Sequence, residues 1–168
     1  MSPRSRMQIQ TQMERESEVC LQGLLLPDKL RELMDALEDT ELPWEWVGPA
    51  NQRHYRRVPG AWLQSLGAEH PVRGALSLFS SGAFVRMLSD CTDLALSTYA
   101  RLELQRWGAA DYSLLPPRAS YARARLEAVL HLGGARALCG GSTTYVAPED
   151  GACGADATLV SVPPAHNA

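Results

Sequence analysis

The sequence predicts an α+β fold, with helices first and a β core after them. Apolar residues recur at helical spacing in the first part of the 168-residue chain, and the second part alternates apolar and polar residues. Short alternating segments are separated by Pro and Gly turn signals, a spacing typical of a sandwich, a jelly roll or a small barrel. Because the helices precede the strands and do not alternate with them, the class is α+β.

The first predicted helix follows the sequence LLLP. Asp28 and Glu32 lie in its early turns, where acidic side chains favour the helix N-terminus. Its core-facing stripe consists of Leu26, Leu30, Leu33, Met34 and Leu37. Residues 1–18, by contrast, are polar with weak periodicity and are predicted to form a tail.

A second helix is predicted over residues 81–91. Ser80 or Ser81 provides its N-cap, because a serine hydroxyl accepts a hydrogen bond from the backbone of the first helical turn. The sequence assigns Phe84, Leu88 and Cys91 to the inner face and Arg86 and Asp90 to the outer face.

From Leu94 the apolar residues repeat every second position, which predicts a strand over 94–105 with one buried face. Four shorter strands are expected after it. They cover residues 111–115, 126–132, 143–146 and 159–162, each bounded by Pro or Gly signals.

The composition excludes several classes of function. A net charge of −3, with basic residues scattered except for Arg53, Arg56 and Arg57, gives no reason to expect direct nucleic-acid binding. No apolar stretch approaches the ~20 residues that span a bilayer, so no membrane partner is expected. The four cysteines lack zinc-ligand spacing and predict free thiols in a reducing compartment, with a Cys139–Cys153 disulfide as the minority alternative.

A jelly roll in a reducing compartment raises the question of an iron oxygenase, whose metal is held by two histidines and a carboxylate. Two of these ligands usually lie on one strand as H-x-D or H-x-E, because alternate residues share a face. The residues two positions after the four histidines are Arg56, Val72, Gly133 and Ala168, so the sequence contains no such pair.

The remaining candidates for chemistry also have structural explanations. His54 and His70 fall in polar loops bounded by prolines, and His131 is expected to be a solvent-facing or hydrogen-bonded residue of a strand. Cys139 with His131 is interpreted as an incidental pairing, because nothing in the sequence orients the histidine as a base. The residues themselves therefore predict no catalytic, cofactor-binding or metal-binding residue, and favour a binding or structural module.

Six spaced motifs occur in order along residues 7–168. They are LLLPDKLRELMDAL, the W-x-x-x-G-P-x-N-x-R-x-Y run from Trp44 to Tyr55, SSGAFVRMLSDCTDLAL, Arg106-Trp107 with Tyr112-Ser113-Leu114, LEAVL with Gly140-Gly141 and Tyr145, and LVSVPPAHN. In this order they resemble the C-terminal half of the 2-oxoglutarate- and iron-dependent prolyl 3-hydroxylases that modify a small-subunit ribosomal protein. That half is often called the oxygenase C-terminal degradation domain. The family has a glycine where this chain has Ala110.

The resemblance implies N-terminal helices packed on a double-stranded β-helix (jelly-roll) core that has no iron or 2-oxoglutarate site. Residues 1–18 would be a polar tail from the end of an absent upstream catalytic domain, and 19–168 an oxygenase-like C-terminal domain truncated before its last strand. Where a catalytic domain has H-x-D, this chain has the 111–115 strand and then Pro116-Pro117. Asp111 is expected at the solvent end of that strand.

Two functions remain open. The first is a non-catalytic module that supports a catalytic oxygenase domain or contacts a ribosomal or regulatory protein. The second is the activity of the parent protein, 2-oxoglutarate-dependent prolyl hydroxylation of a ribosomal protein, attributed to this chain by homology. The parent family implies iron, 2-oxoglutarate and ascorbate, none of which is expected to bind this chain. The implied localisation is the nucleus and cytoplasm.

One motif offers candidate residues for an interaction. It comprises Trp44, Gly48, Pro49, Asn51, Arg53, Tyr55 and Arg56. The structural alternative is that Gly48-Pro49 and Asn51 shape a turn while Tyr55 packs on the core, and turn chemistry favours this alternative.

Overall fold

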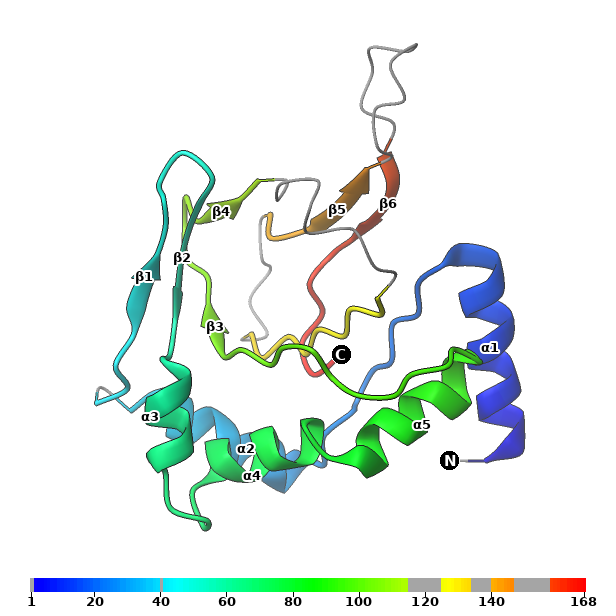
Figure 1. Cartoon of the computed structure of the whole chain (residues 1–168), viewed down its shortest axis with the longest axis horizontal. Coiled ribbons are helices and arrows are strands. Elements are labelled where there is room, and N and C mark those ends of the chain that lie inside the picture. Colours follow the sequence, from blue (N-terminus) through cyan, green and yellow to red (C-terminus); the bar gives the residue numbers. More distant parts are fainter. Residues whose placement is uncertain (1, 40, 115–124, 134–139, 147–157) are drawn as a thin grey trace.

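The computed structural model describes residues 2–39, 41–114, 125–133, 140–146 and 158–168 (Figure 1). Its helices are α1 (Pro3–Glu16), α2 (Pro27–Leu37), α3 (Gly60–Ser65), α4 (Pro71–Phe79) and α5 (Gly82–Thr92). Its strands are β1 (Glu45–Val47), β2 (Arg53–Arg57), β3 (Gln105–Arg106), β4 (Tyr112–Ser113), β5 (Thr143–Val146) and β6 (Thr158–Val162). The predicted α+β class is therefore confirmed.

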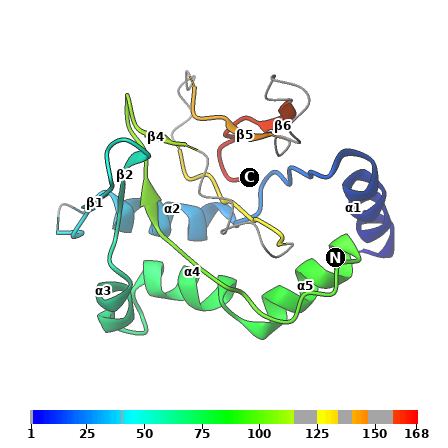
Figure 2. The same cartoon turned by 45° about the horizontal axis from the view of Figure 1, so that its top comes forward.

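The helices form a layer beside the strands. In both ribbon views α3, α4 and α5 follow one another along one side of the molecule, the β1–β2 hairpin rises from one end, and α1 stands at the other (Figures 1 and 2). Buried Leu33 of α2, Val58, Leu63 of α3 and Val72 of α4 form the hydrophobic core cluster. No helix among the described residues is long and apolar enough to cross a bilayer.

The two predicted helices are confirmed with small shifts of their ends. α2 buries Leu33 from the leucine stripe and carries Asp28 in its first turn. In α5 the Ser81 side chain accepts a hydrogen bond from the Phe84 N–H, as its capping role requires. Cys91 lies on the buried face of α5.

Residues 1–18, predicted from the sequence to form a polar tail, contain the helix α1. Ser2 caps this helix by accepting a hydrogen bond from the Ser5 N–H, and Pro3 takes the first helical position, where its missing N–H is no loss. Buried Ile9 and a hydrogen bond from the Gln10 side chain to the Asp90 carbonyl of α5 hold it to the domain. Packing against α5 stabilises a helix whose own apolar periodicity is weak.

The strands pair antiparallel in two groups. β1 pairs with β2, and both β3 and β4 pair with β2 along its other edge, so a turn over residues 107–111 separates them. β5 and β6 form a separate hairpin, which confirms the predicted strands at 143–146 and 159–162. Within the described part of the chain the strands close no barrel.

Two predicted strands are wrong. Residues 94–104 have no regular structure, and the strand predicted over 94–105 shrinks to β3 at its end, because no strand of the described residues pairs with 94–104. Residues 126–132 are irregular as well, and the strand predicted at 111–115 is described only as β4. Leu115, Cys139 and Cys153 lie outside the described residues.

Asn167 ties the C-terminal segment to the start of α2. Its side-chain Oδ1 accepts a hydrogen bond from the Leu25 N–H at 2.9 Å, and its Nδ2 donates to the Leu25 carbonyl at 3.0 Å. Its backbone carbonyl accepts from the Gly23 N–H, and its own N–H donates to the His131 carbonyl. One residue thus joins three segments of the chain, and its φ of 54° is a conformation that asparagine tolerates.

Candidate functional site

The interaction motif forms the β1–β2 hairpin. Gly48 and Pro49, joined by a cis peptide bond, begin its turn, and the Pro49 carbonyl accepts hydrogen bonds from the N–H groups of Gln52 and Arg53. Asn51 is exposed in this turn. Turn chemistry therefore accounts for these residues of the motif.

The strand residues of the motif divide between the two faces of the hairpin. Tyr55 is 5% exposed, lies opposite Val47 and stacks on Trp107 with a ring-centroid distance of 4.6 Å. Arg56 projects from the opposite face, because adjacent residues of a strand point in opposite directions. These contacts agree with the structural alternative, in which Tyr55 packs on the core.

The face that carries Arg56 holds a continuous stack of side chains, here called the arginine–aromatic ladder: Arg56, Trp46, His54 and Tyr112. The Arg56 guanidinium lies 4.6 Å from the centroid of the Trp46 ring. His54 stacks on Trp46 at 4.1 Å between ring centroids and faces Tyr112 at 6.1 Å. The register explains the order, because Trp46 lies opposite Arg56, and His54 lies opposite Tyr112.

Asp111 fixes the imidazole of the ladder. Its Oδ1 lies 3.0 Å from the His54 Nδ1, and its Oδ2 accepts a hydrogen bond from the Gly108 N–H at 2.7 Å. The expectation that Asp111 lies at the solvent end of its strand is wrong: its side chain is 4% exposed. The carboxylate is buried because it closes the turn between β3 and β4 while it holds the histidine.

The sequence interpretation missed this pair. It placed His54 in a polar loop, whereas the residue is in β2. The spacing of Gly108 and Asp111 is a local turn signal, since an aspartate side chain often accepts from a nearby backbone N–H. Nothing local connects Asp111 to a histidine 57 residues earlier in the chain.

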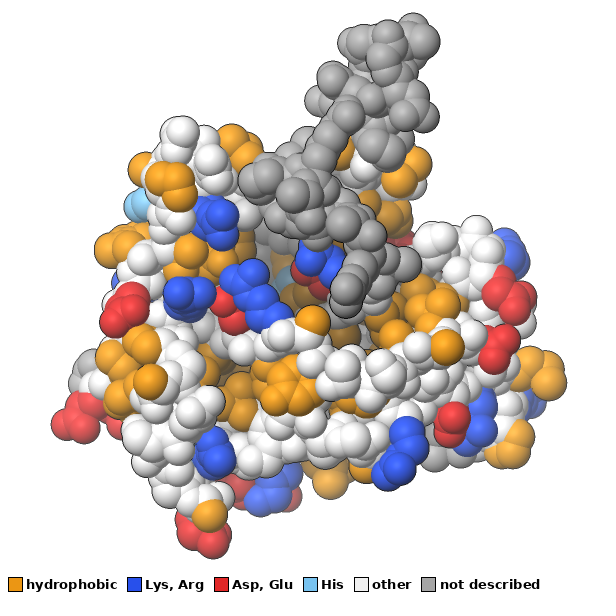
Figure 3. Space-filling model, viewed as in Figure 1, with side chains coloured by type: hydrophobic (Ala, Val, Ile, Leu, Met, Phe, Trp, Pro, Cys, Tyr) orange, Lys and Arg blue, Asp and Glu red, His pale blue; other side chains and the backbone are white. Residues whose placement is uncertain are grey.

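A second charged cluster lies on the other side of the sheet. Glu103 accepts hydrogen bonds from Arg57, Arg101 and Gln105. Burial raises the pKa of Glu103, but the hydrogen bonds from Arg101, Gln105 and Arg57 outweigh it and leave this pKa below its ordinary value. Figure 3 shows Lys and Arg side chains gathered around the hollowed centre of the face in view.

The chain matches, over residues 1–168, the family described as oxoglutarate and iron-dependent oxygenase degradation C-term. The chain belongs to this family. It is 32% identical over 154 residues to prolyl 3-hydroxylase sudestada1 of Drosophila melanogaster, covering 86% of this chain and 27% of that protein. It is 34% identical over 97 residues to prolyl 3-hydroxylase OGFOD1 of Mus musculus, covering 58% of this chain and 17% of that protein. The chain thus spans at most about a quarter of these relatives, in their C-terminal part.

The name of this degradation C-terminal family mentions iron, and the described residues do not fit an iron site. Among the described residues, His54 is the histidine that pairs with a carboxylate, and its ring stacks with those of Trp46 and Tyr112. No group of three His, Cys, Asp or Glu side chains that could hold a metal occurs in the described segments. A facial triad needs two histidines and a carboxylate around one ion, so the His54–Asp111 pair is an anchor for the ladder rather than part of such a triad.

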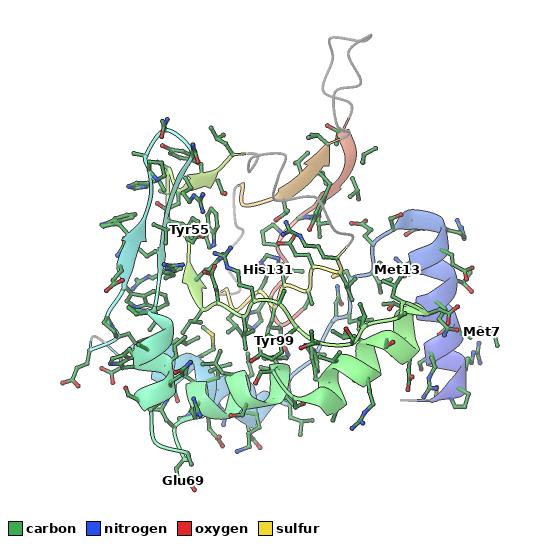
Figure 4. All side chains as sticks on the ribbon, in the orientation of Figure 1. Met7, Met13, Tyr55, Glu69, Tyr99 and His131 are labelled. Carbon is green, nitrogen blue, oxygen red and sulfur yellow. The ribbon has the colours of Figure 1, made fainter. Side chains whose placement is uncertain are left out.

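His131 lies elsewhere, on the segment that crosses the middle of the molecule (Figure 4). The backbone N–H of His131 donates to the Ala168 carbonyl, and the backbone carbonyl of His131 accepts from the Asn167 N–H. Burial lowers the pKa of its imidazole. The residue is half-buried in the junction with the C-terminal segment, and the strand predicted around it is absent.

Proposed function

We propose that this chain is a non-catalytic module of a prolyl 3-hydroxylase-like oxygenase, which supports a catalytic oxygenase domain or mediates contacts with a ribosomal or regulatory protein. The observation that carries the proposal is the absence of any H-x-D or H-x-E in the sequence of a chain that belongs to an oxygenase family. The nuclear and cytoplasmic localisation is part of the same proposal.

Two structural features support this assignment. The His54 and Asp111 side chains that could suggest chemistry are used to hold a stack of rings on an exposed face. The antiparallel pairing of β1–β4 and of β5–β6 is the kind of pairing from which jelly rolls are built. The proposal therefore includes a jelly-roll core for this module.

The alternative is that the chain itself performs the activity that its relatives are named for. The two are separated by incubating the purified chain with ferrous iron, 2-oxoglutarate, ascorbate and oxygen and measuring succinate, with a full-length prolyl 3-hydroxylase as the positive control. We expect succinate at the level of the protein-free blank and no stoichiometric iron uptake in a titration. Turnover above the blank that depends on both iron and 2-oxoglutarate would overturn the proposal.

Association with a catalytic domain is tested separately. The chain and a catalytic oxygenase domain of a family member are mixed, and binding is measured by calorimetry for the unaltered chain and for the double variant Arg53→Ala, Arg56→Ala. The proposal predicts binding by the unaltered chain. Binding that the double variant retains in full would assign the contact to a surface other than the hairpin.

A further inference from the structure

We propose that the arginine–aromatic ladder, together with Arg106, is a docking face for an acidic peptide segment of a protein partner, one that presents Asp and Glu carboxylates. This inference rests on the proposed function, since it names the surface and the partner chemistry of an interaction module. It follows from the exposure, the charges and the ring geometry of the hairpin's outer face.

The face is open and carries cations without counterions. Trp46 is 56% exposed and Tyr112 37%, and Arg106 is exposed as well. Arg56 and Arg106 are directly opposite each other on β2 and β3. Neither forms an ion pair with any carboxylate of the described residues, and the guanidinium of Arg106 lies 5.8 Å from the Trp44 ring centroid.

Two like charges directly opposite on neighbouring strands repel each other and destabilise the sheet. On the other side of the same sheet, Arg57 and Arg101 share a counterion, the carboxylate of Glu103. A carboxylate supplied from outside would relieve the repulsion between Arg56 and Arg106, and a guanidinium binds a carboxylate through two parallel hydrogen bonds. The charges therefore complement an acidic ligand.

The rings of the ladder are held before any partner arrives. Asp111 holds His54, and the Tyr112 hydroxyl donates to the Ala50 carbonyl. The Trp46 ring is in contact with both the Arg56 guanidinium and the His54 imidazole. Ordering these side chains on binding would consume little conformational entropy, which is the property that makes rigid aromatic side chains effective at interfaces.

The ring geometry favours a peptide over a nucleic acid. A nucleobase stacks on a free ring face, but Arg56 and His54 both lie against the Trp46 ring, and His54 has Trp46 stacked on it. Part of the stacking surface of these rings is therefore already occupied, and the edge of an aromatic ring is electropositive. Ring edges and guanidinium groups both attract carboxylates, and the net charge of −3 opposes a long polyanion.

The test uses the whole chain and a short fluorescein-labelled peptide of Asp and Glu separated by Gly, with its Asn and Gln counterpart and labelled oligouridine as comparison probes. Affinity is measured by fluorescence anisotropy for the unaltered chain and for Arg56→Gln, Arg106→Gln and Trp46→Leu. Arg86→Gln on the outer face of α5 is the matched control, because it removes the same charge from an exposed site.

We expect the acidic peptide to bind, more weakly as salt rises, and the amide peptide and oligouridine not to bind. Arg106→Gln and Arg56→Gln should each weaken binding about tenfold, because each removes one paired guanidinium, and Arg86→Gln should leave it unchanged. Circular dichroism shows whether each variant folds. Because Arg106 is exposed, the result for Arg106→Gln decides the test even if Arg56→Gln does not fold.

Equal binding of the acidic and amide peptides, tighter binding of oligouridine, or the same loss in Arg86→Gln would each overturn the inference. None of these outcomes bears on catalysis. Succinate production, by contrast, would overturn the proposed function whatever the peptide does, so the two failures are distinguishable.

Discussion

The two halves of this chain are held in different ways. Every apolar side chain that is buried among the described residues lies before residue 92, from Ile9 to Cys91. After that point the buried residue of the described segments is Asn167, which is polar. The first half thus has the fully buried apolar core, and the second half is attached to it through strand pairing, hydrogen bonds and the half-buried side chains of Leu104 and Leu132.

This difference explains why the sequence predicts the apolar core better than it predicts contacts made by hydrogen bonds. Apolar burial stabilises roughly in proportion to the area removed from water, and it leaves a periodic pattern in the sequence. Attachment by hydrogen bonds depends on single polar groups whose partners are far away in the chain. Substitutions in the two halves should therefore differ in their effects on stability.

The largest effect is expected in the core of the first half. Leu33→Ala should lower the free energy of unfolding by about 2–5 kcal/mol, because it removes a buried side chain and leaves a cavity. Leu159→Ala in β6, where the side chain is 66% exposed, is the control and should change stability by about 0.5 kcal/mol or less. Urea unfolding followed by circular dichroism measures both. Similar losses in the two variants would contradict the comparison.

The attachment of the second half is tested by Asn167→Ala. This change leaves the N–H and carbonyl of Leu25 without their side-chain partners and places alanine at a φ of 54°, so a loss of about 1–3 kcal/mol is expected in the same urea measurement. Hydrogen exchange at the Leu25 amide should accelerate. Asn51→Ala in the exposed hairpin turn is the matched control, and an equal loss there would show that the Asn167 contacts contribute nothing specific.

A gain of stability is expected at Ala110, in the turn between β3 and β4. Its φ of 64° lies in the left-handed region, which costs an L-residue about 1–2 kcal/mol and glycine almost nothing. After the greater flexibility of glycine in the unfolded chain is subtracted, Ala110→Gly should gain about 0.5–1 kcal/mol. Ala109→Gly, next to it without a positive φ, should lose stability. A loss in both variants would refute the assignment of strain to Ala110.

The smallest effect concerns pH. The pKa of Glu103 is lower in the folded chain than its ordinary value of 4.5, so its contribution is present above that pH and is lost as pH falls through the folded pKa. The variant Glu103→Gln lacks this carboxylate, so it should lose less stability on acidification. The difference between its urea midpoints at neutral and strongly acidic pH should therefore be smaller than in the unaltered chain. Glu69→Gln, at an exposed loop before α4 (Figure 4), is the control and should behave as the unaltered chain does.

The helices that sequence could predict are those with local signals. The leucine stripe of α2 and the Ser81 cap of α5 are each readable within a few residues. α1 was missed because the polar composition of residues 1–18 outweighed the Ser2–Pro3 helix start. The helix buries Ile9 and is also held to α5 by the Gln10–Asp90 hydrogen bond. Neither α3 nor α4 was predicted.

The strands and the candidate site show the limit of local patterns. Alternation over 94–105 predicted a long strand, but a strand exists only where a partner pairs with it, and β2 reaches only Gln105 and Arg106. The hairpin motif was found from its residues, whereas the ladder depends on β4 joining β2 and bringing Asp111 to His54. That meeting is set by topology, which no short stretch of sequence encodes.

The Asn167 junction has a practical consequence for handling the protein. Because Asn167 is buried against Leu25 and the Ala168 carbonyl accepts from His131, the last residues lie in the middle of the molecule (Figure 1). A bulky group attached to the side chain of Ala168, through an introduced cysteine, would press on that junction, whereas the first turn of α1 is exposed and suits an attachment. A small environment-sensitive dye at the same position would instead report whether this junction opens before the helical core unfolds.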